Sequence, residues 1–199
     1  MTWELWQSIY RTLRFGERGS MITLIADEGI EGVGYELYEE LSANGMATEY
    51  ISLEGVKVKP CVNCGGCTYK TFGKCVVRDD ADWVLKKIIA ADVLIIVCPI
   101  TFGSYSYKIK QVLDKISLIM DRHYYIKDKE MVKGGMDGRQ FKFFALGINN
   151  GCIDSEIEAF NKLHHENVVI TRGTGSAYVA NLVLTKEKKA QIIREVQGA

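Results

Sequence analysis

Residues 93–116 read VLIIVCPITFGSYSYKIKQVLDKI, and this stretch decides the fold. Its first six residues are apolar throughout and mostly β-branched, as in a central parallel strand that helices cover on both faces. Apolar side chains then recur at helical spacing, so we expect a long helix over residues 104–120, with Ser104 as its cap. A buried strand that leads directly into a helix indicates an α/β domain.

The rest of the chain repeats this alternation of strand and helix. We expect four more strands at residues 21–26, 47–53, 141–146 and 168–171, and four more helices at residues 33–44, 79–91, 154–165 and 185–196. Five strands that alternate with helices predict a parallel sheet with right-handed crossovers. Asp79 and Asp80 suit the cap and first turn of one helix, and His164 and His165 would place a cation at the end of another.

Length and composition favour one domain over residues 1–199. The chain is 47% hydrophobic and has 25 basic and 25 acidic residues, which gives no electrostatic reason for binding nucleic acid or an anionic membrane. No apolar run reaches the roughly 18–20 residues that span a bilayer. Residues 1–19 predict an amphipathic helical extension rather than a signal peptide. Six cysteines without an export signal predict reduced thiols or metal ligands, and a cytoplasmic protein.

Two loops at predicted strand ends carry residues that suit a planar ligand. In open α/β sheets, ligands bind outside the carboxyl ends of the strands. Gly103 lets the backbone approach a ligand closely, Phe102 offers an aromatic edge, and the second loop gathers amide and backbone donors. The candidate residues are Pro99, Ile100, Thr101, Phe102, Gly103 and Ser104 in the first loop, and Gly147, Asn149, Asn150 and Gly151 in the second. Ordinary turns have the same composition, so both interpretations stay open at this point.

The most specific pattern is a cysteine loop at residues 58–78. Cys61, Cys64, Cys67 and Cys75 have the spacing C-x2-C-x2-C-x7-C. Three thiolates at two-residue gaps with a fourth nearby suit a [4Fe–4S] cluster, whereas zinc more often uses two separated CxxC pairs. The alternative is that these cysteines pack as small apolar groups.

Further motifs accompany the cysteine loop within residues 58–126. They are GKC at 73–75, DD at 79–80, P-x-x-x-G at 99–103 and DR at 121–122. Together they resemble the NADPH-dependent FMN reductase and iron–sulfur flavoprotein family. The resemblance implies a flavodoxin-like three-layer sandwich, with a five-stranded parallel sheet of order 2-1-3-4-5.

The resemblance also implies a function and partners. FMN would be held by the two loops, and the protein would be a flavin-dependent oxidoreductase or an electron-transfer protein. NAD(P)H or a ferredoxin would be the donor, and a small molecule or a protein would be the redox partner. Hydride transfer to a flavin depends mostly on alignment, so no catalytic acid or base is expected. A homodimer or homotetramer is implied, with residues 122–135 at the interface.

The loop after the first predicted strand departs from that family. Residues 26–37 read ADEGIEGVGYEL, where the family has a phosphate-binding turn rich in serine, arginine, asparagine and threonine. Glycines at a helix start suit an anion, but the carboxylates of Asp27, Glu28 and Glu31 would repel it. These carboxylates would instead suit a cation or a flavin without its phosphate, or they are solvated acids at a helix start. Two alternatives for the function stay open: a one-electron carrier without reductase turnover, and a flavodoxin-fold subunit that has lost FMN and serves as a binding or assembly module. The acidic loop favours the second.

Overall fold

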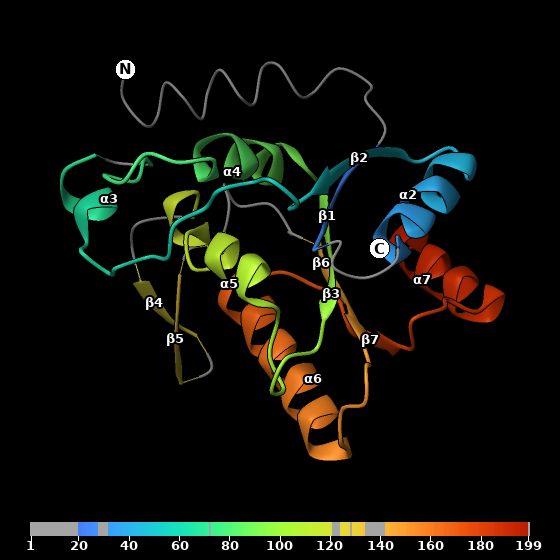
Figure 1. Ribbon diagram of the computed structural model, residues 1–199. Helices are drawn as coiled ribbons and strands as arrows, with labels where there is room; N and C mark the ends of the chain where they lie inside the picture. Colours follow the sequence, from blue (N-terminus) through green and yellow to red (C-terminus); the bar gives the residue numbers. More distant parts are fainter. Residues whose placement is uncertain are drawn as a thin grey trace.

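The computed structural model describes residues 20–27, 32–71, 73–120, 124–127, 129–133 and 142–198. Within them, five parallel strands form one sheet with helices on both faces (Figure 1). The strands are β1 (Met21–Ala26), β2 (Ala47–Ser52), β3 (Val93–Pro99), β6 (Lys142–Ile148) and β7 (Ala177–Ala180). Their order is β2-β1-β3-β6-β7, or 2-1-3-4-5 when only the strands of this sheet are counted. The predicted fold class and strand order are confirmed, whereas the helical extension predicted over residues 1–19 lies outside the described residues.

The helices form the two outer layers. One face carries α2 (Val33–Ala43) and α7 (Lys186–Gly198), and the other carries α4 (Ala81–Ala90), α5 (Tyr107–Leu113) and α6 (Asp154–Ile170). None of the helices in the described ranges is long and apolar enough to cross a bilayer.

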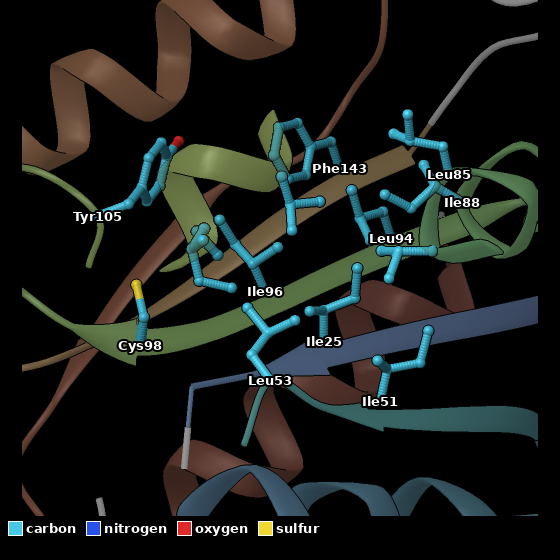
Figure 2. Packing of buried hydrophobic residues seen from close by; sticks show 14 of the residues in the cluster. Ile25, Ile51, Leu53, Leu85, Ile88, Leu94, Ile96, Cys98, Tyr105 and Phe143 are labelled. Carbon is cyan, nitrogen blue, oxygen red and sulfur yellow. The ribbon is translucent and has the colours of Figure 1, made fainter. Parts of the chain in front are cut away.

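β3 shows why the sheet is buried on both sides. Its first six residues are all buried. Leu94, Ile96 and Cys98 belong to the core under α4, α5 and α6, and the residues between them belong to the core under α2 and α7. Successive side chains of a strand point to opposite faces, so an uninterrupted apolar run fills both cores. Figure 2 shows Leu94, Ile96 and Cys98 along β3, with Leu94 on the side of Leu85 and Cys98 on the side of Tyr105.

The prediction of a strand at residues 168–171 is wrong. That segment continues α6, whose buried residues Phe160, His164 and Val168 are four apart and therefore share one helical face. The fifth strand is β7, after a return at Gly175. A Cβ atom there would lie 2.0 Å from the Phe143 carbonyl oxygen, so the chain passes β6 at a distance that only glycine permits.

The prediction of one long helix over residues 104–120 is also wrong. It is divided into α5 and a short 3-10 helix, η1 (Ile116–Leu118). Ser104 belongs to the turn before α5, and the cap is Ser106, whose Oγ accepts the Ile109 N–H at 3.5 Å. The division at Lys115 coincides with the burial of that side chain, which is 2% exposed.

Two small elements were not predicted. A short helix, α3 (Gly66–Tyr69), lies inside the cysteine loop. A hairpin of β4 (Tyr124–Lys127) and β5 (Glu130–Lys133) stands apart from the main sheet, next to the cysteine loop in Figure 1. It lies within residues 122–135, for which a place at the interface was expected but no strand.

Candidate functional site

The carboxyl ends of three neighbouring strands meet at one edge of the sheet. Ala26 of β1 pairs with Val97 of β3, and Pro99 of β3 pairs with Ile148 of β6. The segments that follow these strands therefore start side by side, at the edge where ligands of open α/β sheets bind.

The chain after β3 makes a tight turn at residues 101–104. The Thr101 N–H donates to the Ser104 carbonyl at 2.9 Å, and the Ser104 N–H donates to the Thr101 carbonyl at 3.0 Å. Phe102 and Gly103 have φ angles of 49° and 70°, the left-handed pair that a type I′ turn requires. Phe102 is 92% exposed at the tip. The structure thus presents an aromatic ring and a tight backbone turn at this edge, and their role in binding stays a prediction.

The second loop is tied to the first. The Asn149 side-chain oxygen accepts the Cys152 N–H at 2.8 Å, which closes the loop around the exposed residues Asn150 and Gly151. The Cys152 thiol donates a hydrogen bond to the Ile100 carbonyl oxygen, at a distance of 3.7 Å between sulfur and oxygen. Cys152 therefore links the two predicted loops.

Gly147 does not lie in the turn, and that expectation is wrong. It is part of β6 and pairs with Cys98 of β3. A Cβ atom at Gly147 would lie 2.7 Å from Phe160 Cε1 and 2.8 Å from Ile100 Cγ1. Gly147 is thus needed for close packing beneath the first loop.

The loop after β1 is less acidic than its sequence indicates. The Asp27 carboxylate, 8% exposed, pairs with the Lys108 ammonium at 2.9 Å. The hydrogen bond that Lys108 donates to Asp27 raises the pKa of Lys108. Lys108 was missed because it is 81 residues away, on the first turn of α5. The objection to an anion therefore no longer rests on Asp27, while Glu28 and Glu31 lie outside the described residues.

A buried polar network supports the first loop from behind. The Tyr105 hydroxyl lies 3.0 Å from His164 Nδ1, and His164 Nε2 lies 3.0 Å from the Phe143 carbonyl oxygen. A carbonyl only accepts, so Nε2 carries the proton and Nδ1 accepts the Tyr105 hydroxyl. Burial lowers the pKa of His164 to about 4. The prediction of a cation at a helix end is therefore wrong for His164, which is a neutral side chain inside α6.

All four cysteines of the cysteine loop line one cavity of about 110 Å³. Cys61 and Cys64 are exposed, Cys67 and Cys75 are partly buried, and all four are free thiols. Asn63 and Gly65 have φ angles of 48° and 68°, which turn the chain sharply between the first three cysteines. In the described part of the chain, however, no three histidine, cysteine or acidic side chains already gather closely enough to hold one metal ion.

Cys98 is fully buried at the end of β3. It belongs to the core, and burial raises the pKa of its thiol to about 12. This thiol therefore stays protonated, and it is separate from the cavity of the other four cysteines.

A parallel sheet of this order, with polar turns at its carboxyl edge, defines a flavodoxin-like α/β protein. The match of residues 31–181 to the family model makes the assignment specific: the chain belongs to the NADPH-dependent FMN reductase family. The predicted family is therefore confirmed, and it supports the predicted flavin-dependent oxidoreductase activity with FMN as cofactor.

Curated relatives point in the same direction. An iron–sulfur flavoprotein of Methanosarcina thermophila is 31% identical over 151 residues, which cover 76% of this chain and 72% of that protein. An iron–sulfur flavoprotein of Methanocaldococcus jannaschii is 38% identical over 80 residues, which cover 40% of each. The match thus spans less than half of the second relative's length.

Solved structures support the fold. An NAD(P)H:quinone oxidoreductase from Methanothermobacter marburgensis has a TM-score of 0.58 at 12% identity, covering 92% of this chain and 98% of that one. An FMN-dependent NADH-azoreductase from Bacillus anthracis, in complex with FMN, has a TM-score of 0.57 at 17% identity, covering 90% of this chain and 97% of that one.

Proposed function

We propose that this chain moves electrons between NAD(P)H or a ferredoxin and a redox partner, using FMN at the carboxyl edge of the sheet and a [4Fe–4S] cluster in the cysteine loop. The observation that carries the proposal is the cavity lined by all four cysteines, in a chain of the FMN reductase family. The named iron–sulfur flavoproteins among its relatives support the pairing of the two groups.

The two loops at the carboxyl edge would hold the FMN ring. Residues 99–104 offer the exposed Phe102 ring and the type I′ turn, and residues 149–151 offer exposed amide and backbone groups beside it. When bound, FMN accepts a hydride and returns electrons singly or in pairs. The protein's part is to orient the ring, and the hydrogen bond from the Cys152 thiol to the Ile100 carbonyl joins the two loops.

The phosphate end would lie at the start of α2. Gly32, which precedes the helix, has a φ of 72°, and no side chain caps the helix there. Helix N-termini suit phosphates, and Lys108 neutralises the Asp27 carboxylate beside it. FMN therefore fits this edge better than the sequence of the loop indicates, which weakens the alternative of a subunit that has lost its flavin.

The cysteine loop fits a cluster in its donors. Cys61, Cys64, Cys67 and Cys75 would hold it, since four thiolates are the usual ligands of a [4Fe–4S] group, which passes single electrons. Their sulfurs do not yet converge in the described residues, so we propose that the loop contracts as the cluster assembles. Coupling between metal binding and folding is common where a preformed site is lacking.

The assembly and location follow as part of the same proposal. We propose a cytoplasmic homodimer or homotetramer that uses the hairpin. Tyr124, Ile126 and Met131 are 61%, 83% and 72% exposed, and Ile126 and Met131 are opposite one another on β4 and β5. Apolar side chains on one hairpin face are typical of an interface.

Anaerobic reconstitution with FMN, iron and sulfide tests the function. We expect a yellow-brown protein that contains FMN and about four irons per chain, and that oxidises NAD(P)H or reduced ferredoxin. Replacing Cys64 with serine should abolish iron retention but not FMN binding. Cys152→Ser is the matched control, because this free thiol lies outside the cavity, and it should retain the iron. A protein that takes up FMN but no iron would refute the cluster, and one that takes up neither would favour the assembly module.

A further inference from the structure

A buried ion pair stands at the wall of the cysteine cavity. The Lys115 ammonium lies 2.5 Å from a carboxylate oxygen of Asp79, and the two side chains are 2% and 5% exposed. Among the described residues, Lys115 is one of the largest side chains that are fully buried. Apolar residues of similar size often stabilise a fold as well as a buried ion pair does or better. The stability of the fold alone therefore does not explain why a buried ion pair is present here.

Asp79 connects the pair to the entrance of the cysteine loop. Its Oδ2 accepts the Lys59 N–H at 2.8 Å, two residues before Cys61, and its Oδ1 accepts the Ala81 N–H at 3.0 Å. Burial by itself raises the pKa of Asp79, but the hydrogen bonds from Lys115, Lys59 and Ala81 outweigh burial and lower the pKa. The ionised carboxylate thus joins the loop entrance, the start of α4 and Lys115.

Asp80 adds a second tie to the same segment. Its Oδ2 accepts the Lys57 N–H at 2.7 Å, and the Asp80 N–H donates to the Lys57 carbonyl at 3.2 Å. Neither aspartate acts only as the helix cap that the sequence predicts, because Asp79 caps Ala81 while binding two other segments and Asp80 makes no side-chain cap bond. Both hold the entrance of the loop against α4.

The ion pair is oriented with respect to the cavity. Lys115 lines the cavity together with the four cysteines, whereas Asp79 is absent from the described residues that line it. Lys115 is therefore the member of the pair that lies at the cavity wall beside the cysteines, and Asp79 lies behind it. A cluster bound by four thiolates is an anion, and its reduction by one electron adds a further negative charge. Net charge and hydrogen bonds near the sulfurs set the potential of such clusters.

We propose that Lys115, held in place by Asp79, is a positioning residue of the cysteine centre whose ammonium stabilises the reduced form of the cluster. The inference rests on the proposed function, because it requires a cluster in the cavity. The pair raises the midpoint potential of the cluster and keeps the loop entrance fixed, while the protein takes no part in bond making or breaking in this one-electron step.

The double variant Asp79→Asn/Lys115→Met tests the charge. It removes both charges together, because Lys115→Met alone would leave a buried carboxylate unpaired. In a dithionite titration of the reconstituted proteins followed by electron paramagnetic resonance, the double variant should have a lower midpoint potential than the wild type. Lys86→Met is the matched control, since Lys86 is an exposed lysine of α4 that does not line the cavity, and its midpoint should equal that of the wild type. Equal midpoints in the double variant and the wild type would overturn the proposal.

A second variant and a metal-free measurement keep the test decisive. Lys115→Arg retains the charge and should keep the wild-type midpoint, so a lowered midpoint in this variant would also refute the proposal, even if the double variant does not fold. In the metal-free proteins, hydrogen exchange over residues 57–67 should be about tenfold faster in the double variant, because hydrogen bonds to a charged group are lost. Exchange over residues 99–104 should not change. A wild type that takes up no cluster refutes the proposed function, whereas unchanged exchange refutes the anchoring role of the pair.

Discussion

Replacing His164 with glutamine should flatten the dependence of stability on pH. His164 is 1% exposed and is bound on both sides, by the Tyr105 hydroxyl and by the Phe143 carbonyl. A glutamine amide can still donate to the carbonyl and accept from the hydroxyl, but it does not titrate. The variant therefore removes the proton-binding group while leaving partners for both neighbours.

The expected magnitude follows from the pKa of His164. Burial lowers it from 6.5 to about 4, so below pH 6.5 the unfolded chain binds a proton that the folded protein excludes. The free energy of unfolding therefore falls as the pH falls from about 6.5 to about 4, and this contribution is present in full above pH 6.5. The two values correspond to about 3 kcal/mol in total, of which about 2.5 kcal/mol is lost by pH 4.5.

Urea unfolding at several pH values between 7 and 4.5 measures this effect. The wild type should lose about 2–3 kcal/mol more than His164→Gln over that range. His165→Gln is the matched control, because His165 is the next residue on α6 and its side chain is exposed, and it should behave as the wild type does. Parallel curves for the wild type and His164→Gln would refute the neutral, buried assignment of His164.

Three substitutions at the carboxyl edge give further tests. Gly147→Ala should cost about 1–3 kcal/mol in urea unfolding, because its Cβ would overlap the Phe160 ring, whereas Gly198→Ala meets no atom within 4 Å and should be neutral. Lys108→Met should weaken FMN binding at least about tenfold in a fluorescence titration by leaving Asp27 unpaired, and should leave riboflavin binding unchanged. Phe102→Gly should raise the free energy of unfolding by up to about 1 kcal/mol, because the left-handed φ is released from strain, while FMN binding weakens. Equal losses of FMN and riboflavin binding, or a less stable Phe102→Gly, would contradict the last two.

The sequence predicted correctly those elements whose structure follows from their own residue pattern alone. β1 was predicted with its observed bounds, because an apolar run of six residues ends at an acid and a glycine. β3 needed no context either, since its uninterrupted apolar side chains fit only a strand between two helical layers. The turn after β3 was located correctly for the same reason, although its type I′ geometry was not foreseen.

Residues 168–171 show where local pattern fails. Consecutive β-branched residues favour a strand, but they extend a helix whose buried face already continues through Val168. Tertiary packing overrides propensity over such a short stretch. The sequence also concealed the pairing of Lys108 with Asp27 and of Lys115 with Asp79, because the partners are 81 and 36 residues apart and each lysine sits in a helical pattern that it does not disturb.

One helix supports both loops of the candidate flavin site, although it supplies none of the predicted binding residues. α6 begins directly after the second loop, and a Cβ atom at Gly103 in the first loop would lie 2.8 Å from Ala159 Cβ on that helix. Five residues further along, His164 accepts a hydrogen bond from the Tyr105 hydroxyl, which follows the first loop. The spacing of the two loops is therefore set by a single rigid body rather than by the loops themselves. Small changes on the buried face of α6 should consequently alter FMN affinity without any contact to the ring, and more strongly than changes of equal size on its exposed face.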